Sequence, residues 1–222
     1  MGETSWISPE FQDAVRRLPQ LQRVEFVRSG RVALDPQRPA VSLIARDATR
    51  GGGSLYFPLI GKAYERAQAD PPPAWVSEAV ADRYGYRPGD RITLPLAGAR
   101  HPFVVTGVWR DYARQHGAIV IERSVYAERT GDHRANDAAL WLAPGAVASD
   151  AIHALRGLPG GRLLEISGPG EIKTASLRIF DRTFAVTYAL EAVAVLVGLF
   201  GLSASVGAIV LEIGRASCRE RV

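Results

Sequence analysis

Hydrophobic residues are distributed differently in the two parts of this chain. From Ala192 to Leu211 the sequence AVAVLVGLFGLSASVGAIVL runs without a charge, after a long region in which charged and apolar residues are interspersed. An α-helix rises about 1.5 Å per residue, so about 20 residues cross the roughly 30 Å hydrocarbon layer of a bilayer. Residues 192–211 are therefore predicted to form a transmembrane helix. The alternative is a helix buried in a large soluble domain.

The first part of the chain has the pattern of a small unit with one helix and several strands. Ser8, followed by proline and glutamate, is a typical N-cap and predicts a helix that ends before Pro19. Alternating polar and apolar residues predict strands at 23–27, 31–34 and 40–45. A turn is predicted at Gly30, and the proline-rich run 70–73 predicts a stiff connector with a subdomain boundary near residue 72.

A second, more β-rich pattern follows this connector. Residues 76–84 predict a short capped helix, Gly85 and Gly89 predict a turn, and Gly98 predicts a hairpin. Further strands are predicted at 91–95, 101–109, 118–122, 138–142 and 162–166. A last helix is predicted at 148–155. The predicted fold class is therefore α+β, with a transmembrane α-helix after it.

These elements group into segments along the chain. We expect an α+β subdomain over 1–72, a β-rich subdomain over 73–145, a return to the first subdomain over 146–170, a stalk helix over 171–191, and the membrane helix over 192–211. Residues 212–222 contain the only cysteine, Cys218, and resemble translated cloning-vector sequence, so they are expected to lie outside the fold. The N-terminus is likewise expected to be cut from a longer protein.

Small and polar residues near the membrane span suggest how its helix packs. Small side chains let a neighbouring helix approach closely, and they form two pairs at helical spacing, Ala194 with Gly198 and Ser203 with Gly207. In the stalk, which also carries Arg178, one helical face holds Asp181, Tyr188 and Glu191. We expect Glu191 to lie at headgroup level, where a carboxylate costs little. A proton relay is the alternative role.

Composition excludes several classes of function. Lys and Arg number 27 against 23 Asp and Glu, and the scattered arginines without interleaved aromatic residues argue against nucleic-acid binding. The glycine cluster 157–162 lacks the Lys and Ser/Thr of a phosphate-binding loop, so no nucleotide or other cofactor is expected. Asp132, His133 and Asp137 are consistent with a metal or acid/base cluster, but their hydrophilic surroundings favour a solvated loop. We therefore predict that the chain is not an enzyme and holds no metal.

Two stretches resemble a known family. The sequence from Val76 through Gly85-Tyr-Arg-Pro-Gly-Asp to Leu94, and then Phe103 to Tyr112, resembles the extracytoplasmic core domain of MacB-like and FtsX-like ABC-transporter permeases. The segment 178–191, which leads into the apolar run, looks like the stalk and membrane helix that open that family's membrane domain. The resemblance implies two extracytoplasmic subdomains, one porter-like and one β-rich, in a fragment of a permease.

The resemblance also implies a function. The chain is expected to be part of a permease subunit in a bacterial inner membrane, with its main domain outside the cytoplasm. ATP would bind to a partner ATPase, and a second permease copy and membrane lipid would complete the complex. The expected activity is export or extraction of a hydrophobic or amphiphilic substrate. One alternative is an FtsX-like signalling module that regulates a periplasmic partner protein, and another is a single-span anchored enzyme.

Overall fold

The computed structural model describes residues 6–48, 55, 57–168, 184 and 187–207, and the chain divides into two units, Met1–Leu164 and Glu165–Val222. The elements of the first unit are α1 (Pro9–Arg16), β1 (Leu21–Val32), β2 (Val41–Arg46), β3 (Leu59–Ile60), β4 (Pro73–Ser77), α2 (Glu78–Tyr84), β5 (Arg91–Leu96), β6 (Ala99–Trp109), β7 (Ala118–Glu122), α3 (Arg123–Thr130), β8 (Asp137–Leu142), α4 (Ala148–Gly157) and the 3-10 turn η1 (Gly161–Leu163). This α+β composition confirms the predicted fold class.

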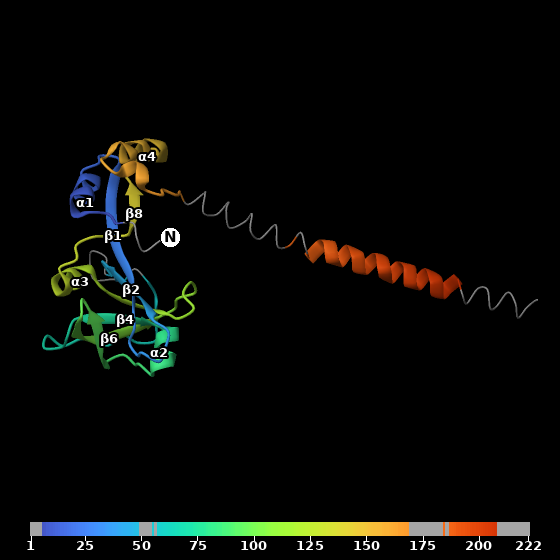
Figure 1. Cartoon of the computed structure of the whole chain (residues 1–222), viewed down its shortest axis with the longest axis horizontal. Helices are drawn as coiled ribbons and strands as arrows, with labels where there is room; N and C mark the ends of the chain where they lie inside the picture. The colour runs from blue at the N-terminus through green and yellow to red at the C-terminus, as the bar shows by residue number, and fades with distance from the viewer. Residues whose placement is uncertain (1–5, 49–54, 56, 169–183, 185–186, 208–222) are drawn as a thin grey trace, which may run out of the picture. The chain divides into compact units, whose positions relative to one another are not determined.

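The long strand β1 joins two lobes of the first unit (Figure 1). Residues 21–27 pair along one edge with β8, whereas residues 28–32 pair along the other edge with β2. The sheet order is β3-β6-β4-β7-β2-β1-β8, and β5 pairs with β6. We call α1, residues 21–27, β8, α4 and η1 the small lobe, and residues 28–32, β2–β7, α2 and α3 the large lobe.

Local sequence signals explain where α1 and α2 begin. The Ser8 hydroxyl accepts a hydrogen bond from the Phe11 amide at 3.3 Å, and Pro9 occupies the first helical turn of α1. In α2 the Ser77 hydroxyl accepts from the amides of Val80 and Ala118, so one buried side chain caps the helix and ties it to β7. α2 ends at Gly85, which has a positive φ of 70°.

The large lobe has a continuous apolar core. Phe103, Leu94, Ile119 and Ile121 are completely buried in it, together with other residues of β2, β4, β5, β6, β7 and α2. A second cluster surrounds Trp75 on the other face of the sheet. The large lobe therefore has the packing of a self-supporting domain.

Three sequence predictions about elements were wrong. Gly30 lies inside β1, where it pairs with Leu43, and forms no turn. Residues 162–166 form no strand, because Gly161–Leu163 makes a 3-10 turn against α4. The predicted helix start at 76 belongs to β4, which begins at Pro73 and is flanked by β6 and β7. Helix α3 and strand β3 were not predicted at all.

The predicted subdomain bounds differ from the observed strand pairing at two places. β2 lies within 1–72 but pairs with β7 of the large lobe, and β8 lies within 73–145 but pairs with β1 of the small lobe. The bounds themselves stay a prediction.

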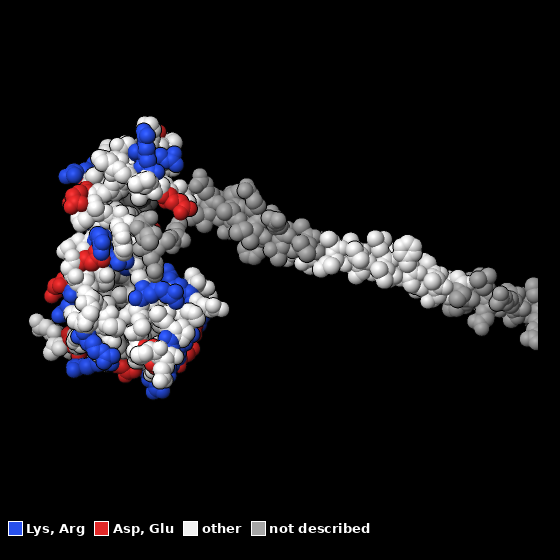
Figure 2. All heavy atoms as spheres, viewed as in Figure 1, with Lys and Arg blue, Asp and Glu red and all other residues white. Residues whose placement is uncertain are grey.

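The second unit contains the apolar helix. Thr187–Gly207 is helical, is long and apolar enough to cross a bilayer, and buries none of its most apolar stretch within the protein. The described atoms of this helix form a nearly uniformly uncharged rod in Figure 2. Residues 208–211, the end of the predicted span, lie outside the described residues. By length and composition this helix agrees with the predicted membrane helix.

Candidate functional site: the junction on β1

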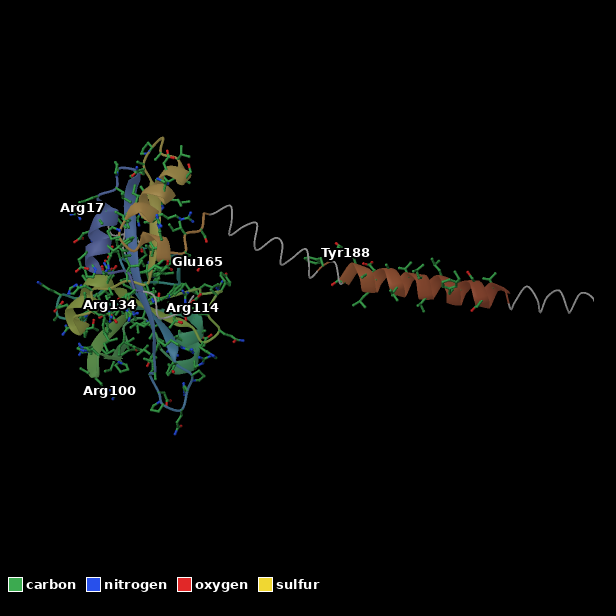
Figure 3. All side chains as sticks on the ribbon, turned by 45° about the horizontal axis from the view of Figure 1, so that its top comes forward. Arg17, Arg100, Arg114, Arg134, Glu165 and Tyr188 are labelled. Atoms are coloured by element: carbon green, nitrogen blue, oxygen red, sulfur yellow. The ribbon has the colours of Figure 1, made fainter. Side chains whose placement is uncertain are left out.

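The first contact cluster lies where β1 changes its pairing partner. The Asp132 carboxylate accepts from Arg28 Nε at 3.0 Å and from Arg134 Nε at 2.8 Å. Both guanidinium groups also stack on the Trp6 ring, at 4.3 Å for Arg28 and 4.4 Å for Arg134. Figure 3 shows Arg134 between Arg17 and Arg100 in that view. The cluster thus joins the segment before α1, β1 and the loop before β8.

The electrostatics of this cluster favour an ionised Asp132. Burial is the largest single influence on its pKa and opposes ionisation, but the hydrogen bonds from Arg134 and Arg28 together outweigh it. They lower the pKa of Asp132 from 3.8 to about 2. The carboxylate is therefore a permanent counter-ion at neutral pH.

Asn136 continues the β ladder across the same point. Its side-chain oxygen accepts from the Ser29 amide at 2.7 Å, and its side-chain nitrogen donates to the Ser29 carbonyl at 2.8 Å. Its own amide donates to the Val27 carbonyl. One asparagine side chain therefore takes the place of a neighbouring strand just before β8 begins.

A second polar group fastens α1 to the loop before β8. The buried Gln12 side chain donates to the carbonyls of Ile7 and His133 at 3.0 Å and accepts from Arg123 at 2.6 Å. Arg123 also donates to the His133 carbonyl. Because Arg123 begins α3, this network connects the small lobe with the large lobe.

The third link is a buried ion pair. Glu25 is 2% exposed and accepts from Arg46 Nη2 at 2.6 Å and from Arg23 Nη2 at 3.2 Å. Glu25 lies in the small-lobe half of β1, whereas Arg46 ends β2 in the large lobe. Arg23 also stacks on Trp141 of β8, at 4.1 Å. Charged side chains thus fix both edges of β1.

A cavity of about 380 Å³ lies beside the large-lobe half of β1. Its walls come from β1, from β2, from the turn between β5 and β6, from Tyr126 of α3 and from Trp6. The lining includes Arg28 and Arg31 but no Asp or Glu. The site is therefore a small, partly open recess whose lining is more polar than apolar, and the charge of Arg28 in it is paired with Asp132.

The residues that suggested enzyme chemistry do not converge. Asp132 is engaged by arginines, and Asp137 is exposed and accepts from the adjacent Ala138 amide. His133 contributes its backbone carbonyl to the Gln12 network. Among the described residues no group of three or more His, Cys, Asp or Glu could hold a metal ion.

The apolar helix presents the predicted packing residues on different sides. At about 100° per residue, Ser203 and Gly207 lie nearly opposite Ala194 and Gly198. Four small residues form one narrow face instead: Ala194, Gly198, Gly201 and Ser205. The last two were missed, although the spacing of four, three and four was readable in the sequence. A packing role for either set remains a prediction.

The predicted stalk is only partly within the described residues. Arg178 and Asp181 lie outside them. Tyr188 and Glu191 are in the first turns of the apolar helix and are exposed, and Tyr188 contacts the Phe184 ring, with 6.4 Å between the ring centroids (Figure 3). The described part is consistent with an interfacial position for Glu191, which stays a prediction.

Comparison with known proteins specifies the class. No family model matches the chain. An uncharacterized ABC transporter permease protein of Mycobacterium tuberculosis is 32% identical over 126 residues, which is 56% of this chain and 14% of that protein. The extracellular domain of the noncanonic ABC-type transporter YknZ from Gram-positive bacteria aligns with a TM-score of 0.51 and 10% identity, over 72% of this chain and 86% of that domain. The periplasmic region of MacB from Actinobacillus actinomycetemcomitans aligns with a TM-score of 0.46 and 12% identity, over 66% of this chain and 72% of that region.

These findings confirm the resemblance to ABC-transporter permeases. The sequence similarity covers more than half of this chain, and the YknZ domain shares its fold. The chain spans only 14% of the length of the Mycobacterium tuberculosis relative, so what the whole permease does is a matter for proposal.

Proposed function

We propose that this chain is the extracytoplasmic domain and an adjoining membrane helix of an ABC-transporter permease subunit. A separate ATPase hydrolyses ATP, and the domain couples that hydrolysis to export or extraction of a hydrophobic or amphiphilic substrate. The observation that carries the proposal is the single strand β1, which both lobes share and which ion pairs hold on both edges. A strand shared in this way offers a path by which a displacement of one lobe would reach the other.

The path from the membrane helix to β1 begins in the small lobe. The last turn before the linking segment, η1, packs tightly on α4, since a side chain at Gly161 would collide with the Leu155 carbonyl. Leu155 and Ala151 in turn bury α4 in the small lobe. A displacement of the chain after Leu164 would therefore move the small lobe as a unit, and β1 would pass it to the large lobe.

The sequence supports the assignment of ATP hydrolysis to a separate subunit. The chain has no GxxxxGK[ST] loop for nucleotide phosphates, so the energy is assigned to a partner ATPase. The small-residue face of the apolar helix suits close packing against another membrane helix, such as one of a second permease copy. On the face drawn in Figure 2, basic and acidic side chains are intermixed, which disfavours a nucleic-acid surface.

Cysteine labelling in a bacterial host tests the membrane placement. The chain carries Cys218→Ser and one new cysteine, either at exposed Arg100 of β6 or at Ser203 in the apolar helix. We expect a membrane-impermeant maleimide to label Arg100→Cys in intact spheroplasts, while Ser203→Cys stays unlabelled until denaturation. Labelling of Arg100→Cys only after lysis, or recovery of the chain in the soluble fraction, would contradict the proposal.

Transport itself is tested with the full-length permease and its ATPase in liposomes. Stimulation of ATP hydrolysis by a lipophilic substrate supports export or extraction. If no amphiphile stimulates the ATPase while the complex binds a periplasmic hydrolase, the signalling alternative replaces it.

A further inference from the structure

We propose that the edge of β1 at Arg31 binds an extended acidic segment of a partner protein, which adds to the sheet as an antiparallel strand. This interaction lies beyond the proposed function, because it requires neither transport nor an ATPase. Three features of the chain carry it: the direction of the backbone groups on β1, the recess beside them, and one exposed charge.

The backbone of Arg31 points away from β2. In an antiparallel pair, residues that bond to the partner strand alternate with residues that point to the other edge. Ser29 points to the other edge, since the Asn136 side chain bonds both its amide and its carbonyl. Arg31 lies two residues further along the same ladder, and its partner Ser42 donates its own amide to the Gly117 carbonyl instead. The amide and carbonyl of Arg31 therefore face the edge that β8 leaves open.

This edge is unpaired at Arg31. β8 pairs with β1 only as far as Val27, Asn136 covers Ser29, and no hydrogen bond from the described part of the chain reaches the Arg31 amide or carbonyl. The cavity of about 380 Å³ lies here and is lined by the consecutive residues 28–32. Its partly open shape and polar lining agree with an exposed strand edge. Such an edge can pair with a strand of another chain.

The side chains on the two faces of β1 define the chemistry of the added strand. Residues that oppose each other in antiparallel strands place their side chains on the same face. Arg31 is exposed and has no ion-pair partner among the described residues, so an acidic residue is favoured opposite it. On the other face, a Cβ built at Gly30 would meet only Arg28 Nη1, at 3.9 Å. An apolar side chain of the partner would fill this space beside Trp6 and Tyr126, and glycine within a strand often marks such a close approach.

The charge at this edge disfavours a second copy of the chain as the partner. Two copies that paired in register along this edge would place one Arg31 opposite the other, and like charges in that position destabilise a strand pair. The other charged residue of the recess, Arg28, is already paired with Asp132, and no acidic side chain lines the recess. An alternating acidic and apolar segment of another protein is therefore the expected occupant.

The test uses the full chain in phosphatidylcholine nanodiscs, with empty nanodiscs as the blank, and the labelled peptide acetyl-Glu-Val-Glu-Val-Glu-amide. Fluorescence anisotropy measures binding, and hydrogen–deuterium exchange at single residues measures backbone protection. Without peptide, the Arg31 amide should exchange faster than the amides of Gly30 and Val32, which face β2. Saturating peptide should slow exchange at Arg31 by about tenfold or more. Overturning results are no saturable binding, binding without protection of Arg31, or protection of Arg31 by dimerisation of the chain alone.

Two N-methylated peptides separate strand addition from simple charge attraction. Glutamates that share the face of Arg31 direct their amides toward β1, whereas the valine amides point away from it. N-methylation of the central glutamate should therefore abolish binding, and N-methylation of the valines should change the Kd by less than about twofold. The peptide with lysine in place of glutamate should bind much more weakly. Equal binding of the two methylated peptides would contradict strand addition.

Variants of Arg31 locate the site. Arg31→Pro removes the unpaired amide without removing a bond to β2, and proline is tolerated at sheet edges, so this variant should lose peptide binding. Arg31→Ala removes only the charge and should weaken binding about two- to fivefold. Arg17→Ala, at the exposed end of α1, is the matched control and should bind as the wild type does. Unchanged binding in Arg31→Pro would overturn the assignment.

A charge reversal covers the case in which Arg31→Pro misfolds. Arg31 is exposed, so Arg31→Glu should fold normally and should prefer the lysine peptide to the glutamate peptide. An unchanged preference would contradict the site. None of these measurements involves cysteine labelling or ATPase stimulation, so failure of this interaction and failure of the proposed function are distinguishable.

Discussion

Different interactions stabilise the interiors of the two lobes of the folded unit. In the large lobe, the strands bury a continuous set of aliphatic and aromatic side chains around Phe103. In the small lobe, the buried set includes Val15, Leu155, the amide of Gln12 and the carboxylate of Glu25. Arginine stacks on Phe26 and on Trp141 there, in place of further apolar packing.

The difference indicates how the unit transmits motion. An apolar core resists deformation because any displacement opens voids, whereas hydrogen bonds and ion pairs can exchange partners at smaller cost. We therefore expect the large lobe to be rigid and the contacts around β1 to be the adjustable part. The variants below test this contrast by the size and pH dependence of their effects on stability.

Phe103→Ala should have the largest effect. Phe103 is completely buried, and its truncation leaves a cavity in the large lobe, so the free energy of unfolding should fall by about 3–5 kcal/mol. Urea unfolding of the full chain in detergent, followed by tryptophan fluorescence, measures it. Tyr112→Ala is the control, because that side chain is 88% exposed and its loss should change stability by less than about 0.5 kcal/mol. Equal effects of the two variants would refute the rigid core.

Glu25→Gln should have the next largest effect on stability. The change leaves two arginines without their shared carboxylate, but their side chains are 39% and 29% exposed and regain water. We expect a loss of about 2–3 kcal/mol, below the 3–5 kcal/mol typical of a fully buried pair. Faster hydrogen exchange along β1 and β2, with β5 and β6 unchanged, would show that the damage is local. Glu65→Gln, at an exposed position, serves as the control.

Local signals in the sequence predicted local structure well. The Ser8 and Ser77 caps, the Gly98 hairpin and the uncharged run of the apolar helix each depend on neighbouring residues, and each was found. Gly30 was misread as a turn because its strand neighbours, Leu43 above all, lie elsewhere in the chain.

The candidate site was beyond such reasoning. Arg28 and Asp132 are separated by 104 positions, and only the pairing of β1 with β8 brings them together. Their charges alone fit an exposed loop as well as a buried cluster. The strand β4 was missed for a related reason: two prolines precede it and a third begins it, and its place between β6 and β7 is set by partners later in the sequence.

Asp132→Asn should have a moderate, pH-dependent effect. The folded-state pKa of about 2 lies below the ordinary 3.8, so the ionised form stabilises the fold above about pH 4 and this contribution is lost as the pH falls toward 2. At pH 7 the variant should be less stable by about 1–2 kcal/mol, after allowance for solvent screening. Unfolding midpoints of wild type and variant should converge near pH 2. A constant difference across that range would mean that the charge of Asp132 is not what stabilises the junction.

Glu122→Gln should have the smallest effect and the opposite sign. Glu122 ends β7, and burial raises the pKa of its carboxyl above 4.5, with nearby Asp47 acting in the same direction against the Ala48 amide. The folded state is therefore favoured when Glu122 is protonated. The stability that this group contributes is present below pH 4.5 and is lost as the pH rises through the raised pKa.

Glutamine at this position keeps an acceptor for the Ala48 amide, which lies 3.3 Å from Glu122 Oε2. At pH 7 the variant should match or exceed the wild type by less than about 1 kcal/mol, and the gain should vanish in acid. Opposite pH slopes for Asp132→Asn and Glu122→Gln would show that these two carboxylates act independently. Parallel slopes would show instead that they titrate as one network.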